Sequence, residues 1–136
     1  MTVLIVNGPN MQNLDKRKLY NASYQQLIER TTTIARELGI DLDFFVSDIE
    51  GEIVSTIANC QCDAIIINAA AYSHYSIAIR DALEIFDGKK IEVHMTNIYK
   101  REQFRHQSVV SPVVDGTISG FGLESYVLAL KSLKVV

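Results

Sequence analysis

The sequence has no excess of basic residues and no long apolar run, and both absences exclude classes of protein. Its 136 residues hold 13 lysines and arginines against 16 aspartates and glutamates, a net charge of −3. Nucleic-acid binding leaves a basic footprint, so we expect no nucleic-acid partner. No stretch approaches the roughly 20 apolar residues of a membrane span, and the N-terminus lacks the basic segment of a secretory signal. These features predict a cytoplasmic protein without a membrane partner.

Cysteine is scarce, and Cys60 and Cys62 are the two in the chain. A Cys-x-Cys pair could touch a metal ion, but no second ligand pair with zinc-site spacing accompanies it. We therefore expect no metal, and we expect two reduced thiols near a helix end.

Phosphate-binding motifs are also missing. The turn Asn7-Gly8-Pro9-Asn10 closes the first apolar run with a single glycine, without the Lys-Ser/Thr of a P-loop or a G-x-G-x-x-G pattern. This absence removes most of the case for a bound nucleotide.

The apolar residues, 48% of the chain, gather in short runs that predict strands. We interpret these runs as strands that are apolar on both faces rather than alternating, which is typical of a parallel sheet covered on both sides. The length suits one domain spanning residues 1–136. The runs are residues 3–6, 42–46, 64–67 and 91–95, with a weaker one at 117–118.

Helical patterns lie between these runs. The clearest follows Ser23, a predicted N-cap, and ends at Gly39. Alternation of strands and helices predicts an α/β protein with a flavodoxin-like, doubly wound, five-stranded parallel sheet in three α/β/α layers. The other helical patterns cover residues 53–57, 77–85 and 123–133.

This architecture predicts where a ligand binds, because open parallel sheets bind ligands beyond the carboxyl ends of their strands. The unusual polar residues of the chain are found there. They occur at residues 7–10, 47–48, 68–74 and 94–97.

His94 is an ionisable residue inside an otherwise apolar run. It is either a core histidine satisfied by hydrogen bonds or a functional group. Glu92 lies two positions earlier on the same strand face, where it could hold the ring as a proton donor.

Arg17 and Tyr20 lie three residues apart in a polar loop. One interpretation is that both are solvated loop residues. The other is that the guanidinium stabilises a phenolate, since a tyrosine acts as a base only when its pKa falls well below about 10. A base and an acid on separate elements facing one cavity suit the elimination of water.

With these residues in place, the chain resembles the type II 3-dehydroquinate dehydratase family along nearly its whole length. The motifs that carry the resemblance are Asn-Gly-Pro-Asn at residues 7–10, Glu-Gly-Glu at 50–52, N-x-x-A-Y-S-H-x-S-x-A-x-R at 68–80, E-V-H-x-T-N at 92–97 and R-E-x-F-R-H at 101–106.

The resemblance implies the reversible dehydration of 3-dehydroquinate to 3-dehydroshikimate, by anti elimination through an enolate and without a cofactor. The pathway would be aromatic biosynthesis through shikimate, or quinate breakdown. Tyr20 would be the base beside Arg17, and His94 the acid oriented by Glu92. Asn10 would hold a water beside the enolate. The other substrate contacts would come from Asn68, His74, Met95, Thr96 and Arg105.

The resemblance also implies a homo-oligomer, a dodecamer built from trimers, in which Asp81 reaches a neighbouring subunit's site. Asp81 follows Arg80 on a helix whose pattern is otherwise apolar. A pair between these two side chains within one chain is the alternative.

Two departures from the family pattern stand out. The family loop usually reads Arg-Glu-Pro-x-x-Tyr-Gly, with five steps from arginine to tyrosine, whereas Arg17 and Tyr20 are three apart, without the proline and glycine. The family turn Asn-Pro-Gly-Ala is replaced by alanines after Asn68. Other functions therefore stay open: a non-catalytic ligand-binding relative acting as a sensor or assembly module, or a flavin- or nucleotide-binding domain.

Overall fold

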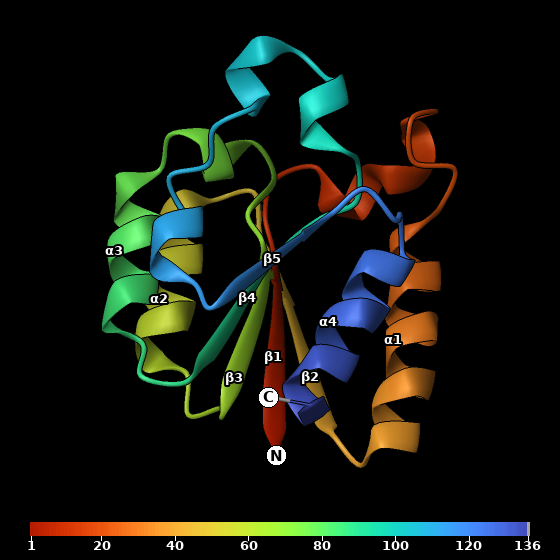
Figure 1. Ribbon diagram of the computed structural model, residues 1–136, viewed down its shortest axis with the longest axis vertical. Helices are drawn as coiled ribbons and strands as arrows, with labels where there is room; N and C mark the ends of the chain where they lie inside the picture. The colour runs from red at the N-terminus through yellow and green to blue at the C-terminus, as the bar shows by residue number, and fades with distance from the viewer. Residues whose placement is uncertain (136) are drawn as a thin grey trace.

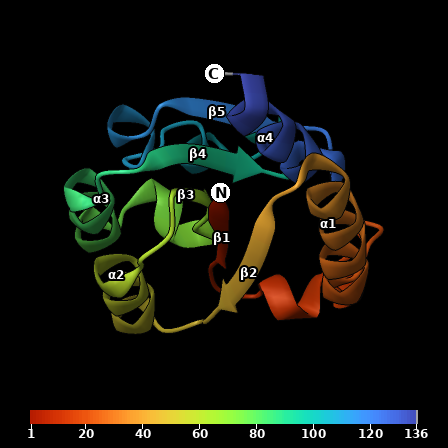
Figure 2. The same cartoon turned by 90° about the horizontal axis from the view of Figure 1, so that it is seen from below.

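The computed structural model describes residues 1–135, in which a parallel sheet lies between two layers of helices (Figure 1). The strands run through the centre, with α2 and α3 on one side and α1 and α4 on the other, as Figure 2 also shows. The elements are β1 (Thr2–Asn7), α1 (Tyr24–Leu38), β2 (Asp41–Val46), α2 (Glu50–Asn59), β3 (Ala64–Asn68), α3 (Ile77–Ile85), β4 (Lys89–His94), β5 (Gly116–Ser119) and α4 (Glu124–Val135).

The strand order is β2-β1-β3-β4-β5, and every neighbouring pair is parallel. This is the order of the flavodoxin-like doubly wound fold, so the predicted fold class is confirmed. Among the described residues, no helix is long and apolar enough to cross a membrane.

Two apolar clusters hold the layers together. Successive strand residues point to opposite faces, so Ile66 packs in the cluster under α1 and α4, while Ile65 and Ile67 pack in the cluster under α2 and α3. All five residues of β3 are buried. β3 therefore packs apolar residues on both faces of the sheet, as its sequence predicts.

The predicted burial is wrong for β2, which is an edge strand. Asp41 and Asp43 are exposed, and the apolar residues between and after them are only half-buried. An edge strand is covered less completely than a central one, and the alternating polar residues at its start follow from that position.

The ends of α1 are those that the sequence predicts. The Ser23 hydroxyl accepts a hydrogen bond from the Gln26 backbone N–H, and the Gln26 side chain accepts one from the Ser23 N–H, which completes a capping box. Gly39 ends the helix with a φ of 70°, in the left-handed region that favours glycine.

The two cysteines are joined in a disulfide, so the expectation of reduced thiols is wrong. Cys60 ends α2 with an extended backbone, which leaves its Cα 5.5 Å from that of Cys62. This separation lies within the range that a disulfide spans.

Candidate active site

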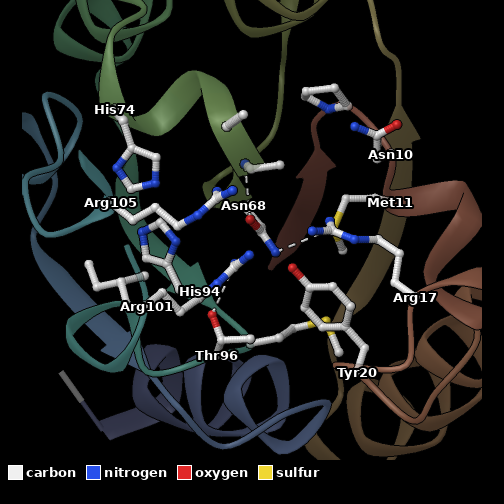
Figure 3. A pocket seen from close by; sticks show the side chains of 15 residues that line it. Asn10, Met11, Arg17, Tyr20, Asn68, His74, His94, Thr96, Arg101 and Arg105 are labelled. Atoms are coloured by element: carbon white, nitrogen blue, oxygen red, sulfur yellow. Dashed lines mark hydrogen bonds between the residues drawn. The ribbon is translucent and has the colours of Figure 1, made fainter. Parts of the chain in front are cut away.

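A cavity of about 100 Å³ opens at the carboxyl edge of the sheet (Figure 3). It is bounded by the turn after β1, the short helical turn after β3 and the long loop after β4. The predicted site residues that line it are Asn10, Arg17, Tyr20, Asn68, His74, His94, Met95, Thr96 and Arg105.

The backbone of the turn after β1 lies in direct contact with the backbone at the end of β3. The Gly8 N–H donates to the Asn68 carbonyl at 2.8 Å, and a side chain at Gly8 would come within 2.4 Å of the Ala69 carbonyl oxygen. Asn10 follows in a left-handed conformation, with a φ of 69°, and its N–H donates to the Asp48 carboxylate at 2.9 Å. The sequence motif Asn-Gly-Pro-Asn thus places Asn10 at the rim of the cavity.

Asn68 ends β3, and its amide group is held on both sides. Its Oδ1 accepts from the Ala70 N–H at 3.0 Å, and its Nδ2 donates to the Tyr126 hydroxyl at 2.9 Å. Tyr126, fully buried on α4, donates in turn to Asn7 Oδ1 at 2.6 Å. The second hydrogen of Asn68 Nδ2 points to the Met11 sulfur at 3.6 Å, a weak acceptor that a ligand oxygen in the cavity can replace.

Arg17 and Tyr20 point into the cavity from the loop after the 3₁₀ turn η1 (Met11–Lys16) (Figure 3). The Tyr20 N–H donates to the Arg17 carbonyl at 3.1 Å, which closes a tight turn. This turn brings the guanidinium carbon to 4.9 Å from the centre of the phenol ring, a cation–π distance. The spacing of three residues therefore still brings the cation to the phenol.

His94 ends β4 on the other side of the cavity from Tyr20 (Figure 3). Its ring is buried, and its Nε2 lies 2.5 Å from a carboxylate oxygen of Glu92. Burial opposes ionisation of Glu92, but hydrogen bonds from His94, Ser108 and Ser111 outweigh it, so its pKa lies below the ordinary value. Glu92 does not line the cavity and lies behind the ring.

His74 closes the wall beside His94, and the two rings stack with centroids 6.1 Å apart. Its Nδ1 lies 2.9 Å from the Gln107 carbonyl, which can only accept, so Nδ1 carries the proton. Burial is the main cause that lowers the pKa of His74 below 6.5. The neutral ring therefore keeps Nε2 as an acceptor.

Arg101 is a site residue that the sequence analysis missed. It lines the cavity together with Arg105, and its guanidinium lies 3.5 Å from the Thr96 hydroxyl. Both arginines also pair with Glu102, at 3.8 and 3.2 Å. The sequence signal that could have identified it is the R-E-x-F-R-H motif, in which two arginines stand four residues apart. Both arginines lie on a loop made of short 3₁₀ turns.

Asp81 is not brought to this cavity. It lies on the exposed side of α3, where its carboxylate pairs with Arg80 at 2.8 Å. The expectation of an apolar stripe around it is wrong, because the buried stripe of the helix runs through Ile79, Ala82 and Leu83 instead. The pair within one chain, the stated alternative, is present.

Residues 1–134 match the family model described as dehydroquinase class II. A 3-dehydroquinate dehydratase of Caldicellulosiruptor bescii is 46% identical over 140 residues, covering 98% of this chain and 97% of the relative. One of Clostridium perfringens is 44% identical over 140 residues, covering 98% of this chain and 96% of the relative. The crystal structure of a type II dehydroquinase from Butyrivibrio crossotus is similar, with a TM-score of 0.95 at 40% identity, covering 98% of this chain and 97% of that one. The chain belongs to the dehydroquinase class II family.

Proposed function

We propose that this chain, a hydro-lyase by its family, converts 3-dehydroquinate to 3-dehydroshikimate and water through an enolate, as one catalytic domain and without a cofactor. The observation that carries the proposal is the placement of two ionisable pairs in one cavity. Arg17 and Tyr20 lie on one side, and His94 backed by Glu92 lies on the other. A base and an acid on opposite sides of one cavity suit an elimination.

Tyr20 is the base of the proposed reaction. Its phenolate takes the proton from the carbon beside the ketone, and the electron pair of that bond moves into the carbonyl to form the enolate. The Arg17 guanidinium, 4.9 Å from the ring centre, stabilises negative charge on the phenolate before the transfer. Asn10, at the rim, is placed to hold a water beside the enolate oxygen.

His94 is the acid. An ionised Glu92 can accept hydrogen bonds but cannot donate them, so the proton between Glu92 and the imidazole resides on His94 Nε2. Nδ1 is then the ring nitrogen that can serve the cavity. When His94 is doubly protonated, Nδ1–H protonates the departing hydroxyl. The enolate collapses, the carbon–oxygen bond breaks, and water leaves with the proton.

The remaining residues bind the substrate. Arg101 and Arg105 present planar cationic forks that match a carboxylate. The Asn68 Nδ2 hydrogen that faces the Met11 sulfur and the acceptor of His74 Nε2 offer opposite hydrogen-bonding partners to ring hydroxyls. Thr96 and the Met95 backbone complete the wall.

An imine mechanism through lysine finds no support in the cavity, because no lysine is among its lining residues within the described chain. Lys90 is engaged elsewhere, with its ammonium donating to the Leu83 and Phe86 carbonyls. The proposed proton transfers therefore use the phenol and the imidazole rather than an amine.

The pathway we propose is the shikimate route to aromatic compounds, with quinate breakdown as the other use of the same chemistry. The test is direct: purified protein is mixed with 3-dehydroquinate, and the absorbance of the conjugated enone product is followed. Catalytic growth of that absorbance supports the enzyme. Saturable binding of 3-dehydroquinate without turnover would support the sensor alternative.

We also propose assembly as a dodecamer built from trimers. Asp81 lies on the exposed face of α3 beside the half-buried Arg80, where a neighbouring subunit could exchange the pair within one chain for a pair between chains. Light scattering of the wild-type protein gives its mass, and Asp81→Ala should reduce it. An unchanged large oligomer in the variant would leave the pair within the chain as the only role of Asp81.

A further inference from the structure

Glu92 is the most deeply buried carboxylate beside the cavity, with 1% of its surface exposed. A buried charge is costly unless donors replace the water it has lost. Three donors do so. His94 Nε2 and the Ser108 hydroxyl reach Oε2, at 2.5 and 2.6 Å, and the Ser111 hydroxyl donates to Oε1.

Both serines come from the far end of the loop that follows β4. Ser111 begins the 3₁₀ turn η5 (Ser111–Val113), which returns the chain to β5. The same loop carries Arg101 and Arg105 on its outward path. Two hydroxyl bonds therefore tie the segment that holds the cavity arginines to the strand that holds the acid.

The Ser108 hydroxyl has one clear hydrogen-bond direction. Its oxygen accepts from the N–H groups of Val110 and Ser111, at 3.2 and 3.3 Å. Its single hydrogen can go to Glu92 at 2.6 Å or to the Ser73 carbonyl at 3.3 Å, and the shorter, charged acceptor is favoured. The Ser108 hydroxyl therefore donates its hydrogen to the Glu92 carboxylate, because the two backbone N–H groups occupy its lone pairs.

The arrangement constrains the neighbouring imidazole. With one serine on each oxygen, the carboxylate plane cannot rotate without losing a bond, so Oε2 stays in front of His94 Nε2. The other charged or titratable groups facing this pair are His74 from the turn after β3 and Arg101 and Arg105 from the loop. None of these makes a hydrogen bond to Glu92 in the described residues. Apart from His94, the two serines are therefore the side chains that donate to the carboxylate.

We propose that Ser111 and Ser108 are positioning residues for the proton donor. Their hydroxyls hold the Glu92 carboxylate in the arrangement that keeps a proton on His94 Nε2 and leaves Nδ1 for the cavity. This inference rests on the proposed role of His94 as the acid. It adds that the loop after β4 sets the protonation geometry of the site as well as binding the substrate carboxylate.

Ser111→Ala is the variant that tests the proposal, because the Ser111 hydroxyl has no other bond among the described residues than the one to Glu92. Ser111→Thr restores a hydroxyl at the same position. Ser73→Ala is the matched control, since Ser73 is fully buried beside the same loop and its hydroxyl has no partner in the described structure. All three are compared in ligand-free protein labelled with ¹⁵N-histidine, with His94→Gln used to assign the His94 signals.

The ¹⁵N shifts report which ring nitrogen carries the proton, and the exchange of the Nε2 proton with water reports how firmly it is held. We expect wild type, Ser73→Ala and Ser111→Thr to show His94 protonated on Nε2 with slow exchange. In Ser111→Ala the exchange should be about tenfold faster, with a second tautomer present, and kcat should fall about tenfold while KM changes less.

Equal His94 shifts and exchange in wild type and Ser111→Ala would overturn the proposal, as would an equal change in Ser73→Ala or a failure of Ser111→Thr to restore the signal. The spectra need no substrate. A protein that lacks dehydratase activity would therefore refute the proposed function without affecting this test, and the two failures can be told apart.

Discussion

Tyr126→Phe removes one oxygen from the buried network beneath the cavity, and its cost can be worked out from the contacts. The hydroxyl accepts from Asn68 Nδ2 at 2.9 Å and donates to Asn7 Oδ1 at 2.6 Å. Both amides are buried, with Asn7 fully so. The variant therefore leaves one donor and one acceptor without partners, each costing about 1–3 kcal/mol. Because the lost hydroxyl no longer has to be desolvated, we expect a net loss of about 2–4 kcal/mol in the free energy of unfolding.

Tyr24→Phe is the matched control, because the Tyr24 hydroxyl is buried near Asn7 but makes no hydrogen bond of good geometry in the described residues. Its removal should change the free energy of unfolding by less than about 1 kcal/mol, in the stabilising direction. Urea unfolding at one pH measures both variants. The KM of Tyr126→Phe should also rise, because Asn68 loses its strongest Nδ2 hydrogen bond. Equal stabilities of the two variants would show that the network is not held as the contacts indicate.

Four further outcomes follow from the site. Tyr20→Phe should abolish turnover while the substrate Kd, measured by calorimetry, stays within a few-fold; near-normal activity would assign the base elsewhere. His94→Ala should lower kcat by about 10²–10⁴ in steady-state assays, and a smaller effect in folded protein would favour a purely structural histidine. Ala70→Gly should raise the free energy of unfolding in urea by up to about 1 kcal/mol, because Ala70 has a φ of 54°, and a loss would contradict strain there. The lowered pKa of Glu92 contributes stability that is fully present above its ordinary pKa of 4.5 and is lost as the pH falls through the lower folded value. Glu92→Gln should therefore weaken the fall in the free energy of unfolding at acid pH, measured by urea unfolding. An unchanged fall at acid pH would mean that Glu92 is not held ionised.

The fold was predictable because local signals and the overall pattern agree. Largely apolar runs predicted β3 and β4 as strands of a sheet covered on both faces, and Ser23 with Gly39 marked the two ends of α1. The burial of β2 was not predictable, since sheet order decides which strand lies at an edge. The disulfide was missed for a similar reason, because two cysteines at this spacing suit a bridge only in certain backbone conformations.

The site was predictable where side chains follow strand ends directly, as Asn68 and His94 do. It was less so where loop geometry decides. Arg101 and Arg105 stand in one motif, yet only the path of the short 3₁₀ turns shows that both reach the cavity. Tyr126 falls within the helical pattern at residues 123–133, and its contact with Asn68 depends on packing across the sheet that no local pattern encodes.

The placement of Tyr20 and His94 on opposite sides of the cavity makes a stereochemical claim that one experiment tests most directly. 3-Dehydroquinate carrying deuterium at one of the two hydrogens beside the ketone, on the face opposite the departing hydroxyl, is converted under single-turnover conditions, and the product is weighed by mass spectrometry. The account predicts that the deuterium is lost, because base and acid act from opposite faces. Retention of the deuterium, with loss of the hydrogen on the same face as the hydroxyl, would contradict it.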